Sequence, residues 1–329
     1  MPVKIGMMSF AHMHAGSYAH SICSRNDTEM VGIADHDPAR TAAMAQQFNT
    51  RAFESYEELL SAPGLQAVVV CCENIKHREL VEMAAAAGKH VLCEKPLATT
   101  IADAEAMISA CESAGVQLMT AFPCRYSPVM QRMKAVLDSG EAGKVLAIRG
   151  TNRGRNPGGW FVQKELSGGG ATIDHTVHVT DLMRWILKDE VSEVYAEISN
   201  GINHLDFDDV GFLSLTFKQG AFGTLDASWS RPKSFPTWGD VTMEVVTENG
   251  TLSMDMFAQN LVLYSDKTNS VSWQNWGGNM DDGLMGAFAK AVAEGSPVPI
   301  TGVDGLRAAE VALAAYQSAE ISAPVKLTA

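Results

Sequence analysis

Three residues from two distant parts of the chain have the types that proton-transfer chemistry needs. Lys95 follows a short apolar segment, between a glutamate and a proline. Asp174 and His178 are four residues apart in a segment that begins with three consecutive glycines. On a helix this spacing places both side chains on one face, where a carboxylate can orient an imidazole for acid–base catalysis. A cation, a carboxylate and an imidazole would together suit a hydride transfer coupled to proton movement, so we expect an enzyme.

Lys95 and His178 also have purely structural interpretations. Lys95 could be a solvated residue in a Lys-Pro turn, but it comes directly after the expected strand His90–Cys93. Ligands bind at the carboxyl ends of parallel strands in open α/β folds, which favours a functional role. His178 could be a buried, hydrogen-bonded histidine, or it could form half of a zinc-binding pair. A zinc site would need a third ligand, and none is evident in the sequence.

The first part of the chain alternates short apolar segments with longer segments of helical periodicity. Strands that are apolar on both faces and separated by helices indicate a doubly wound parallel sheet, the Rossmann arrangement. We therefore expect an α/β domain over residues 1–122. The expected strands are Val3–Met8, Met30–Ala34, Ala67–Cys72, His90–Cys93 and Val116–Ala121, and the expected helices are Ala15–Ser24, Pro38–Phe48, Lys76–Ala87 and Ile101–Ala114.

From residue 123 onward the pattern changes to strands rich in β-branched and aromatic residues, joined by tight turns. We expect an α+β domain over residues 123–329 with a large, mostly antiparallel open sheet, which would serve substrate binding and oligomerisation. The expected strands are Lys144–Thr151, Val194–Ser199, Val210–Phe217, Phe222–Ser230, Val241–Thr247 and Leu261–Tyr264, and the expected helices are Pro128–Ser139, Ala171–Lys188, Gly283–Glu294 and Asp304–Ile321.

The turn after the first expected strand is where a dinucleotide-binding fold normally carries the pattern G-x-G-x-x-G. Ser9, Ala11 and His14 stand at the glycine positions, so the turn alone does not establish such a fold. Asp35 ends the second expected strand, where a carboxylate can accept both ribose hydroxyls and repel a 2′-phosphate. We therefore expect NAD, with NADP disfavoured. The alternative is that Asp35 is a turn or capping residue before the next helix.

His12 and His14 form an H-x-H pair, and imidazole is a common metal ligand. Two such ligands without a carboxylate nearby in the sequence are too few for a metal site. We expect no metal, and we interpret both histidines as lining the cofactor turn.

The composition limits the partners and the location of the protein. A net charge of -13, a pI near 5.1 and the absence of any Lys/Arg run disfavour nucleic acid and membrane surfaces. No apolar stretch approaches the roughly 20 residues that span a bilayer, and the N-terminus shows no signal-peptide pattern, so we expect a soluble, cytoplasmic protein. The six cysteines show neither a CxxC pair nor zinc-ligand spacing, which indicates reduced packing residues.

The order of these features resembles the Gfo/Idh/MocA family of NAD(P)-dependent oxidoreductases over essentially the whole chain. The resemblance implies that Lys95, Asp174 and His178 are catalytic, with His178 as the general base toward a sugar or polyol hydroxyl. It implies that Glu94 lies near the nicotinamide and that the Lys95–Pro96 bond is cis. The expected cofactor contacts are Ser9, Phe10, Ala11, His12, Met13, His14, Asp35, Cys72, Asn74, His77, Glu94, Lys95 and Arg125.

Substrate contacts are expected from the second domain, where an aromatic face can stack on a pyranose and Arg, Asn or His donors can recognise hydroxyls or a carboxylate. His175 stands where many family members have glycine, which indicates a specialised pocket. Arg153 and Arg155 could equally belong to a solvated loop or a subunit interface. The expected contacts are Tyr126, Arg153, Arg155, Asn156, Trp160, His175 and Asp181, with Arg125 a candidate for either ligand.

The resulting hypothesis is an NAD-dependent dehydrogenase of a sugar or polyol, in which Lys95 holds the alcohol oxygen and Asp174 orients His178 or the substrate. Two alternatives remain open: an NAD-dependent glycosidase or lyase that uses transient oxidation, and a non-catalytic regulator that binds the cofactor. An exposed antiparallel sheet would favour a homodimer or homotetramer formed through the second domain.

Overall fold

The computed structural model describes residues 1–258, 260–267, 269–275 and 278–327. The chain forms two compact units, and each of them draws on separate stretches of sequence. The first unit contains Met1–Pro123, Glu165–Gly168 and Asp281–Leu306, and the second contains Cys124–Lys164, Gly169–Met280 and the chain from Arg307 onward. In the part of the chain that is described, no helix is both long and apolar enough to cross a membrane.

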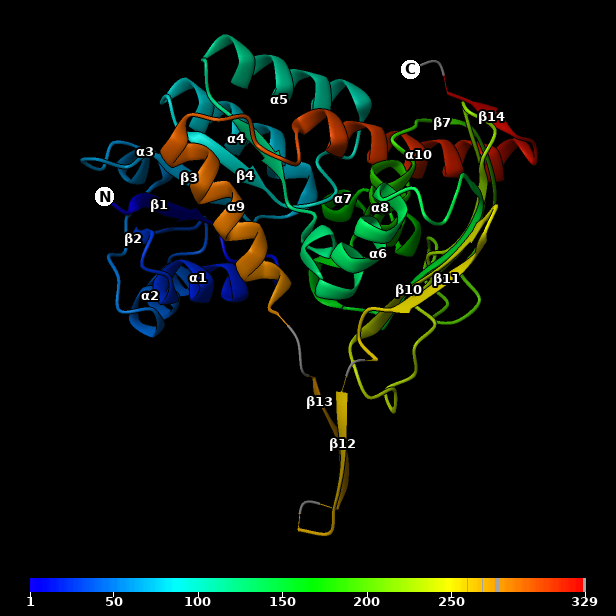
Figure 1. The fold of residues 1–329 in the computed structure, drawn as a ribbon. Helices are drawn as coiled ribbons and strands as arrows, with labels where there is room; N and C mark the ends of the chain where they lie inside the picture. The colour runs from blue at the N-terminus through cyan, green and yellow to red at the C-terminus, as the bar shows by residue number, and fades with distance from the viewer. Residues whose placement is uncertain (259, 268, 276–277, 328–329) are drawn as a thin grey trace. The chain divides into compact units, whose positions relative to one another are not determined.

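The first unit is built on a five-stranded parallel sheet with the order β2-β1-β3-β4-β5. Its central strands are fully buried because helices cover both faces, α4 and α5 on one side and α1 and α2 on the other (Figure 1). This arrangement confirms the doubly wound sheet expected from the apolar segments. The strands are β1 (Val3–Met8), β2 (Thr28–Ala34), β3 (Ala67–Val70), β4 (His90–Cys93) and β5 (Leu118–Thr120).

Side-chain caps fix where several helices of the first unit begin. Asp37 accepts hydrogen bonds from the backbone N–H groups of Ala39 and Arg40, and Thr100 accepts one from Asp103. Such caps satisfy backbone donors that have no partner within the helix. The helices are α1 (Ala15–Ser24), α2 (Pro38–Gln47), α3 (Tyr56–Leu60), the 3₁₀ turn η1 (Asn74–Lys76), α4 (His77–Ala86), α5 (Ile101–Ser113) and α9 (Met280–Glu294).

The second unit contains a seven-stranded sheet with the order β11-β10-β6-β9-β8-β7-β14, in which only the β6–β9 pair is parallel among the described strands. The mostly antiparallel sheet expected from the sequence is therefore confirmed. A separate hairpin joins β12 (Asn260–Ser265) to β13 (Ser270–Asn275). The seven strands are β6 (Val145–Gly154), β7 (Val191–Ser199), β8 (Val210–Phe217), β9 (Phe222–Asp226), β10 (Gly239–Thr247), β11 (Gly250–Asp255) and β14 (Val325–Lys326).

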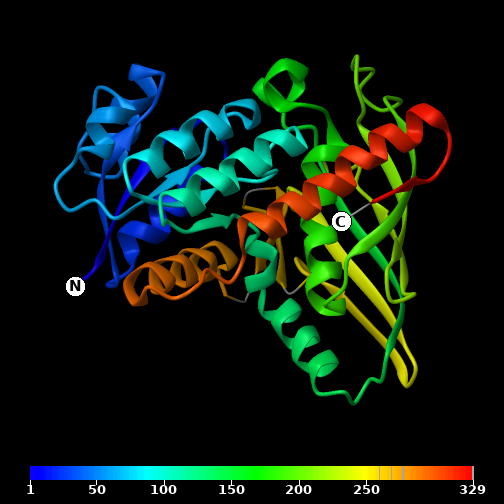
Figure 2. The same ribbon diagram turned by 90° about the horizontal axis from the view of Figure 1, so that it is seen from above.

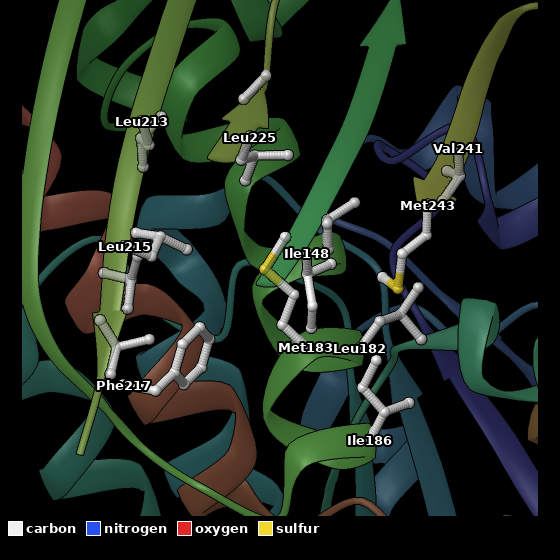
Figure 3. Close-up of a cluster of buried hydrophobic side chains, with 14 of the residues drawn as sticks. Ile148, Leu182, Met183, Ile186, Leu213, Leu215, Phe217, Leu225, Val241 and Met243 are labelled. Atoms are coloured by element: carbon white, nitrogen blue, oxygen red, sulfur yellow. The ribbon is translucent and has the colours of Figure 1, made fainter. Parts of the chain in front are cut away.

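Helix α8 (Ala171–Leu187) packs against one face of this sheet and carries both Asp174 and His178. Figure 2 shows α8 and α10 (Gly302–Ile321) on the same side of the strands. Between helix and sheet, Leu182, Met183 and Ile186 interlock with strand residues such as Ile148 and Leu215 (Figure 3). The remaining helical segments are η2 (Pro123–Tyr126), α6 (Pro128–Asp138), η3 (Gly159–Val162) and α7 (Lys164–Ser167).

The opposite face of the seven-stranded sheet presents apolar side chains to solvent. Phe212 is 53% exposed and Phe222 is 59% exposed, and both alternate along their strands with buried residues such as Leu213 and Leu225. Val246 is likewise 39% exposed on β10. Large apolar side chains gathered on one sheet face are typical of an interaction surface.

Candidate functional site

Lys95 stands at the carboxyl end of β4 in a turn that is held from two sides. The backbone N–H of Lys95 donates to Glu94 Oε2 at 2.9 Å, and the side chain of Lys95 is almost fully buried. The Lys95–Pro96 peptide bond is cis, as the family resemblance implied. His77 Nδ1 lies 3.0 Å from the carbonyl oxygen of Pro96, so this nitrogen carries the proton and donates it. His77 is fully buried and therefore supports the turn directly.

Glu94 is a fully buried carboxylate that faces two imidazoles. His14 Nδ1 lies 3.0 Å from Glu94 Oε1, and His12 Nδ1 lies 3.6 Å from the same oxygen. Burial acts to raise the pKa of Glu94, but its neighbours His12, His14 and Lys95 bring it well below its usual range. Glu94 is therefore ionised at neutral pH.

His12, His14 and Glu94 offer three possible metal ligands whose donor atoms lie within 4.8 Å of one another. Sequence analysis missed this grouping because Glu94 is 80 residues away from His14. The backbone N–H of His14 donates to His12 Nδ1 at 3.2 Å, which engages the lone pair that a metal would need at that atom. The geometry therefore favours a hydrogen-bonded cluster at this position over a metal centre.

The cofactor turn keeps a glycine-like backbone although it lacks the glycines. Ser9 has φ of 74°, in the left-handed region that favours glycine. Its hydroxyl donates to Asp35 Oδ2 at 2.9 Å and accepts the N–H of Ala11 at 3.1 Å. Phe10 N–H donates to the same carboxylate at 2.6 Å. These bonds stabilise the turn shape that glycine would otherwise provide, while Met13 is 47% exposed within it.

Asp35 is already bound by a cation that sequence analysis did not identify. Arg40 Nε lies 2.8 Å from Asp35 Oδ2, and Arg40 Nη2 lies 2.6 Å from Oδ1. Burial acts to raise the pKa of Asp35, but hydrogen bonds from Arg40 and from the N–H groups of Phe10 and Asp37 lower it overall. The sequence offered one signal for this pair, since Arg40 stands near the start of a helix, five residues after the aspartate that follows the strand.

Two other expected cofactor contacts in the first unit are buried. Asn74 Nδ2 donates to the carbonyl oxygen of Ser167 at 2.9 Å. Cys72 is fully buried, and burial raises the pKa of its thiol well above the usual value. All six cysteines are free, and five are buried, as expected for packing residues, whereas Cys23 is exposed.

In the second unit, Asp174 and His178 are both buried on α8, one turn apart. Asp174 Oδ2 accepts the indole N–H of Trp229 at 3.2 Å and lies 3.3 Å from His175 Nε2. His178 Nδ1 faces the thiol of Cys124 at 3.9 Å. Neither Trp229 nor Cys124 was expected from the sequence, since both lie more than 50 residues away from the side chains they contact.

The start of α8 is capped by a residue from another part of the chain. Asp208 Oδ1 accepts the N–H of Gly170 at 3.0 Å, and Asp208 Oδ2 accepts the N–H of Thr172 at 2.7 Å. The hydroxyl of Tyr316 donates to Asp208 Oδ1 at 2.8 Å. A Cβ atom at Gly170 would collide with the backbone of Asp208, and one at Gly169 would collide with the Tyr316 hydroxyl. These two glycines are therefore required by packing around the cap, which holds the helix that carries Asp174 and His178.

Several expected substrate contacts are engaged with neighbouring residues. Arg125 and Asp181 form a buried two-bond salt bridge, with distances of 2.7 and 2.5 Å. Asn156 Oδ1 accepts the N–H of Gly158 at 2.8 Å, and Arg155 donates to the carbonyl of Phe235.

The aromatic candidates have different surroundings. Burial raises the pKa of Tyr126 to about 12. Trp160 stacks on Phe161 with ring centres 3.9 Å apart, so one of its faces is covered. His175 meets the ring of Trp238 edge-on at 5.4 Å, and Trp238 is 44% exposed. Trp238 is an aromatic candidate that sequence analysis missed.

Arg153 points away from α8. A Cβ at Gly150 would touch Val179, and one at Gly154 would touch His175, so even-numbered residues in this part of β6 face the helix. Side chains alternate along a strand, which directs Arg153 to the opposite face. There it lies 3.1 Å from Asp240 and lines a groove with Phe212. This position supports the interface role that the sequence left open.

The five-stranded parallel sheet, with Asp35 directly after β2, has the architecture of a dinucleotide-binding domain. Residues 3–122 match the model described as an oxidoreductase family with an NAD-binding Rossmann fold, and residues 130–253 match the GFO/IDH/MocA C-terminal domain. The chain belongs to the Gfo/Idh/MocA family of oxidoreductases. The expected fold class, enzyme class and NAD cofactor are therefore confirmed, and neither the glycosidase or lyase alternative nor the non-catalytic regulator is favoured.

Similar proteins match the chain over nearly its whole length. A myo-inositol 2-dehydrogenase of Thermotoga maritima is 29% identical, with 99% of this chain and 98% of that protein covered. The crystal structure of GenD2 from gentamicin A biosynthesis, in complex with NAD, has a TM-score of 0.91 at 26% identity, covering 100% and 97%. A levoglucosan dehydrogenase in complex with NADH and L-sorbose has a TM-score of 0.83 at 25% identity, covering 99% of each chain.

Proposed function

We propose that the protein oxidises a secondary alcohol of a sugar or polyol and transfers the hydride to NAD. The observation that carries this proposal is that a carboxylate and an imidazole, Asp174 and His178, are both buried and lie one turn apart on α8. The chain that holds them belongs to a family of NAD-binding oxidoreductases. The similar proteins named as inositol and levoglucosan dehydrogenases support the substrate class.

Lys95, Asp174 and His178 have separate roles in the proposed reaction. His178 removes the hydroxyl proton as hydride leaves the carbon, and Lys95 holds the alcohol oxygen and stabilises its developing negative charge. Since Nδ1 of His178 faces Cys124, we assign Nε2 as the atom that takes the proton. Asp174, already fixed by Trp229, orients the substrate or the imidazole.

We also propose a site for the sugar ring on the second unit. Trp238 offers an exposed indole next to His175, which in turn contacts Asp174. An aromatic face of this kind stacks on the apolar side of a pyranose. We keep Tyr126, Arg155, Asn156 and Trp160 as further substrate contacts, with Arg125 and Asp181 acting as a joined pair.

The remaining proposals concern organisation and location. Residues 1–122 would bind the dinucleotide, and residues 123–329 would bind substrate and form a homodimer or homotetramer. The exposed apolar face that carries Phe212 and Phe222 supports burial against a second copy. We propose a cytoplasmic location. The acidic composition supports the absence of a nucleic-acid partner. The hydrogen bond that His12 Nδ1 accepts supports the absence of a resident metal.

The function is tested by a substrate screen. The purified protein and NAD are mixed with inositols, aldoses, uronic acids and glycosides, and NADH formation is followed by absorbance. Net NADH with one or more sugars or polyols supports the dehydrogenase. Glycoside cleavage without net NADH would instead identify the transient-oxidation reaction, and NAD binding without any turnover across the panel would contradict an enzyme of this substrate class.

A further inference from the structure

His14 is the one histidine of the H-x-H motif whose side chain reaches the surface. Its side chain is 32% exposed, whereas those of His12 and Glu94 are 1% and 0% exposed. His14 precedes α1 at the helix N-terminus and contacts Glu94 through Nδ1. The proposed reaction assigns no task to this motif.

The buried carboxylate of Glu94 connects His14 to Lys95. Oε1 of Glu94 lies 3.0 Å from His14 Nδ1, and Oε2 accepts the backbone N–H of Lys95 at 2.9 Å. A buried carboxylate is costly unless donors and cations compensate it. Moving the carboxylate would therefore move the backbone that carries the Lys95 side chain.

The two imidazoles beside Glu94 do not have the same role. His12 Nδ1 accepts the backbone N–H of His14, so this atom carries no proton to donate to the carboxylate. His14 Nδ1 is at hydrogen-bond distance from Glu94 and can donate. Of the two histidines, His14 is therefore the one that can donate a hydrogen bond from Nδ1 to Glu94 and balance the charge of that carboxylate.

We propose that His14 is a positioning residue, which holds the Glu94 carboxylate against the backbone of Lys95 and, as an imidazolium, balances the charge of that carboxylate beside the cofactor. The proposal rests on the proposed function, because it assumes that Lys95 and Glu94 border the nicotinamide. It assigns a second proton-dependent group to the protein besides His178.

The groups around His14 determine how it responds to pH. Glu94, Asp281, Lys95, and the rings of His12 and Tyr18 face it. Burial lowers the pKa of His14, but the charge and hydrogen bond of Glu94 raise it more, with a further contribution from Asp281, so the net shift is upward. A raised pKa keeps the imidazolium present at low and neutral pH, and the charge is lost as the pH rises through the pKa of the folded protein.

This titration has a consequence for the cofactor. The nicotinamide ring is cationic in NAD⁺ and neutral in NADH, so a nearby imidazolium disfavours NAD⁺. Loss of the His14 proton should therefore improve NAD⁺ binding relative to NADH. A residue with a merely structural role would leave this ratio unchanged across pH.

The experiment compares His14→Asn with the matched control His20→Asn, since His20 is exposed on α1, the helix that His14 precedes. Asparagine keeps a donor near the Nδ1 position but cannot carry the charge. NADH is titrated by fluorescence and NAD⁺ by competition, between about pH 6 and pH 9.5, using the full-length protein. His14→Ala is measured in parallel, and melting curves establish that each variant is folded.

In the unmodified protein and in His20→Asn, the ratio of the NAD⁺ to the NADH dissociation constant should fall about 5-fold to 10-fold with rising pH. In both His14 variants it should stay flat. With any substrate found in the screen, His14→Ala should lose about 10-fold to 100-fold in kcat, and His14→Asn should retain more of it. These outcomes together support the proposal.

A His14 variant that keeps the pH dependence of the ratio would overturn the proposal while leaving the dehydrogenase intact. If no substrate is found but the ratio behaves as described, the proposed function fails and the role of His14 stands. Absence of NADH binding to the unmodified protein would overturn both. If the purified protein contains one zinc ion per chain and the Glu94→Gln variant contains none, the cluster binds a metal. That result would also overturn the proposal.

Discussion

Arg40 joins Asp35 through two parallel hydrogen bonds, Nε to Oδ2 at 2.8 Å and Nη2 to Oδ1 at 2.6 Å. Asp35 directly follows β2, where the ribose of a dinucleotide is recognised in Rossmann folds. Ser9 and Phe10 also donate to its carboxylate. The acid that selects against a 2′-phosphate is thus neutralised by a guanidinium, the group best suited to bind that phosphate.

Asp35→Ala should therefore change cofactor preference. We expect kcat/KM with NAD to fall about 10-fold to 100-fold, because the ribose acceptor is lost, and activity with NADP to rise as Arg40 becomes available. Steady-state kinetics with both cofactors measure the change. The control is the double variant Asp35→Ala/Arg40→Leu, in which the gain with NADP should disappear; a gain that survives would exclude Arg40 as the phosphate contact.

The Asp208 cap should contribute to the stability of the α8 region. Asp208→Asn keeps the shape but leaves Gly170 and Thr172 without a charged acceptor, so we expect the free energy of unfolding to fall by about 1–3 kcal/mol. Urea denaturation followed by circular dichroism gives this value. Asp206→Asn, at an exposed position nearby, should change it by less than about 0.5 kcal/mol. Equal effects of the two changes would argue against the cap.

Much of the fold was predictable because it follows from local periodicity. Ala15–Ser24 and Val210–Phe217 form a helix and a strand with the expected bounds. The five-residue helix α3 was missed because it is too short to show a periodic pattern, although Ser55 caps it. The short strand β14 was missed because its pairing partner, β7, lies more than 120 residues earlier.

The residues of the candidate site could be predicted from the sequence, but the residues that contact them could not. The sequence shows three consecutive glycines before α8 but not their role, which is that Gly169 and Gly170 make room for Tyr316 and Asp208. These contacts join residues 38 to 146 positions apart, a distance at which spacing carries no information. Arg40 was missed because a strand-to-helix boundary separates it from Asp35. Neither the strand period nor the helix period relates two side chains across such a boundary.

Trp238 should affect substrate affinity more than the chemical step. Trp238→Ala should raise KM for the sugar about 10-fold with little change in kcat, since stacking acts on the ground state and the transition state alike. Initial-rate kinetics separate the two constants. Tyr264→Ala removes another exposed aromatic ring, on β12, and should leave both unchanged. A loss confined to kcat in Trp238→Ala would contradict a stacking role.

The exposed sheet face should determine the oligomeric state. Phe212→Glu places a charge on a side chain that is 53% exposed in the single chain, and burying that charge against a second copy is costly. We expect dissociation to a smaller species in size-exclusion chromatography with light scattering. Ile75→Glu, an exposed apolar residue of the first unit, serves as the control and should leave the mass unchanged. An unchanged mass for Phe212→Glu would place the interface elsewhere.

The central claim, that Lys95 acts on the alcohol that donates hydride to NAD, is tested most directly by Lys95→Ala. Turnover is measured by NADH formation with a substrate from the screen, and cofactor binding is measured separately by NADH fluorescence. We predict that turnover falls by about 1,000-fold or more while the NADH dissociation constant changes by less than about 3-fold. Turnover equal to that of the unmodified protein would contradict the account.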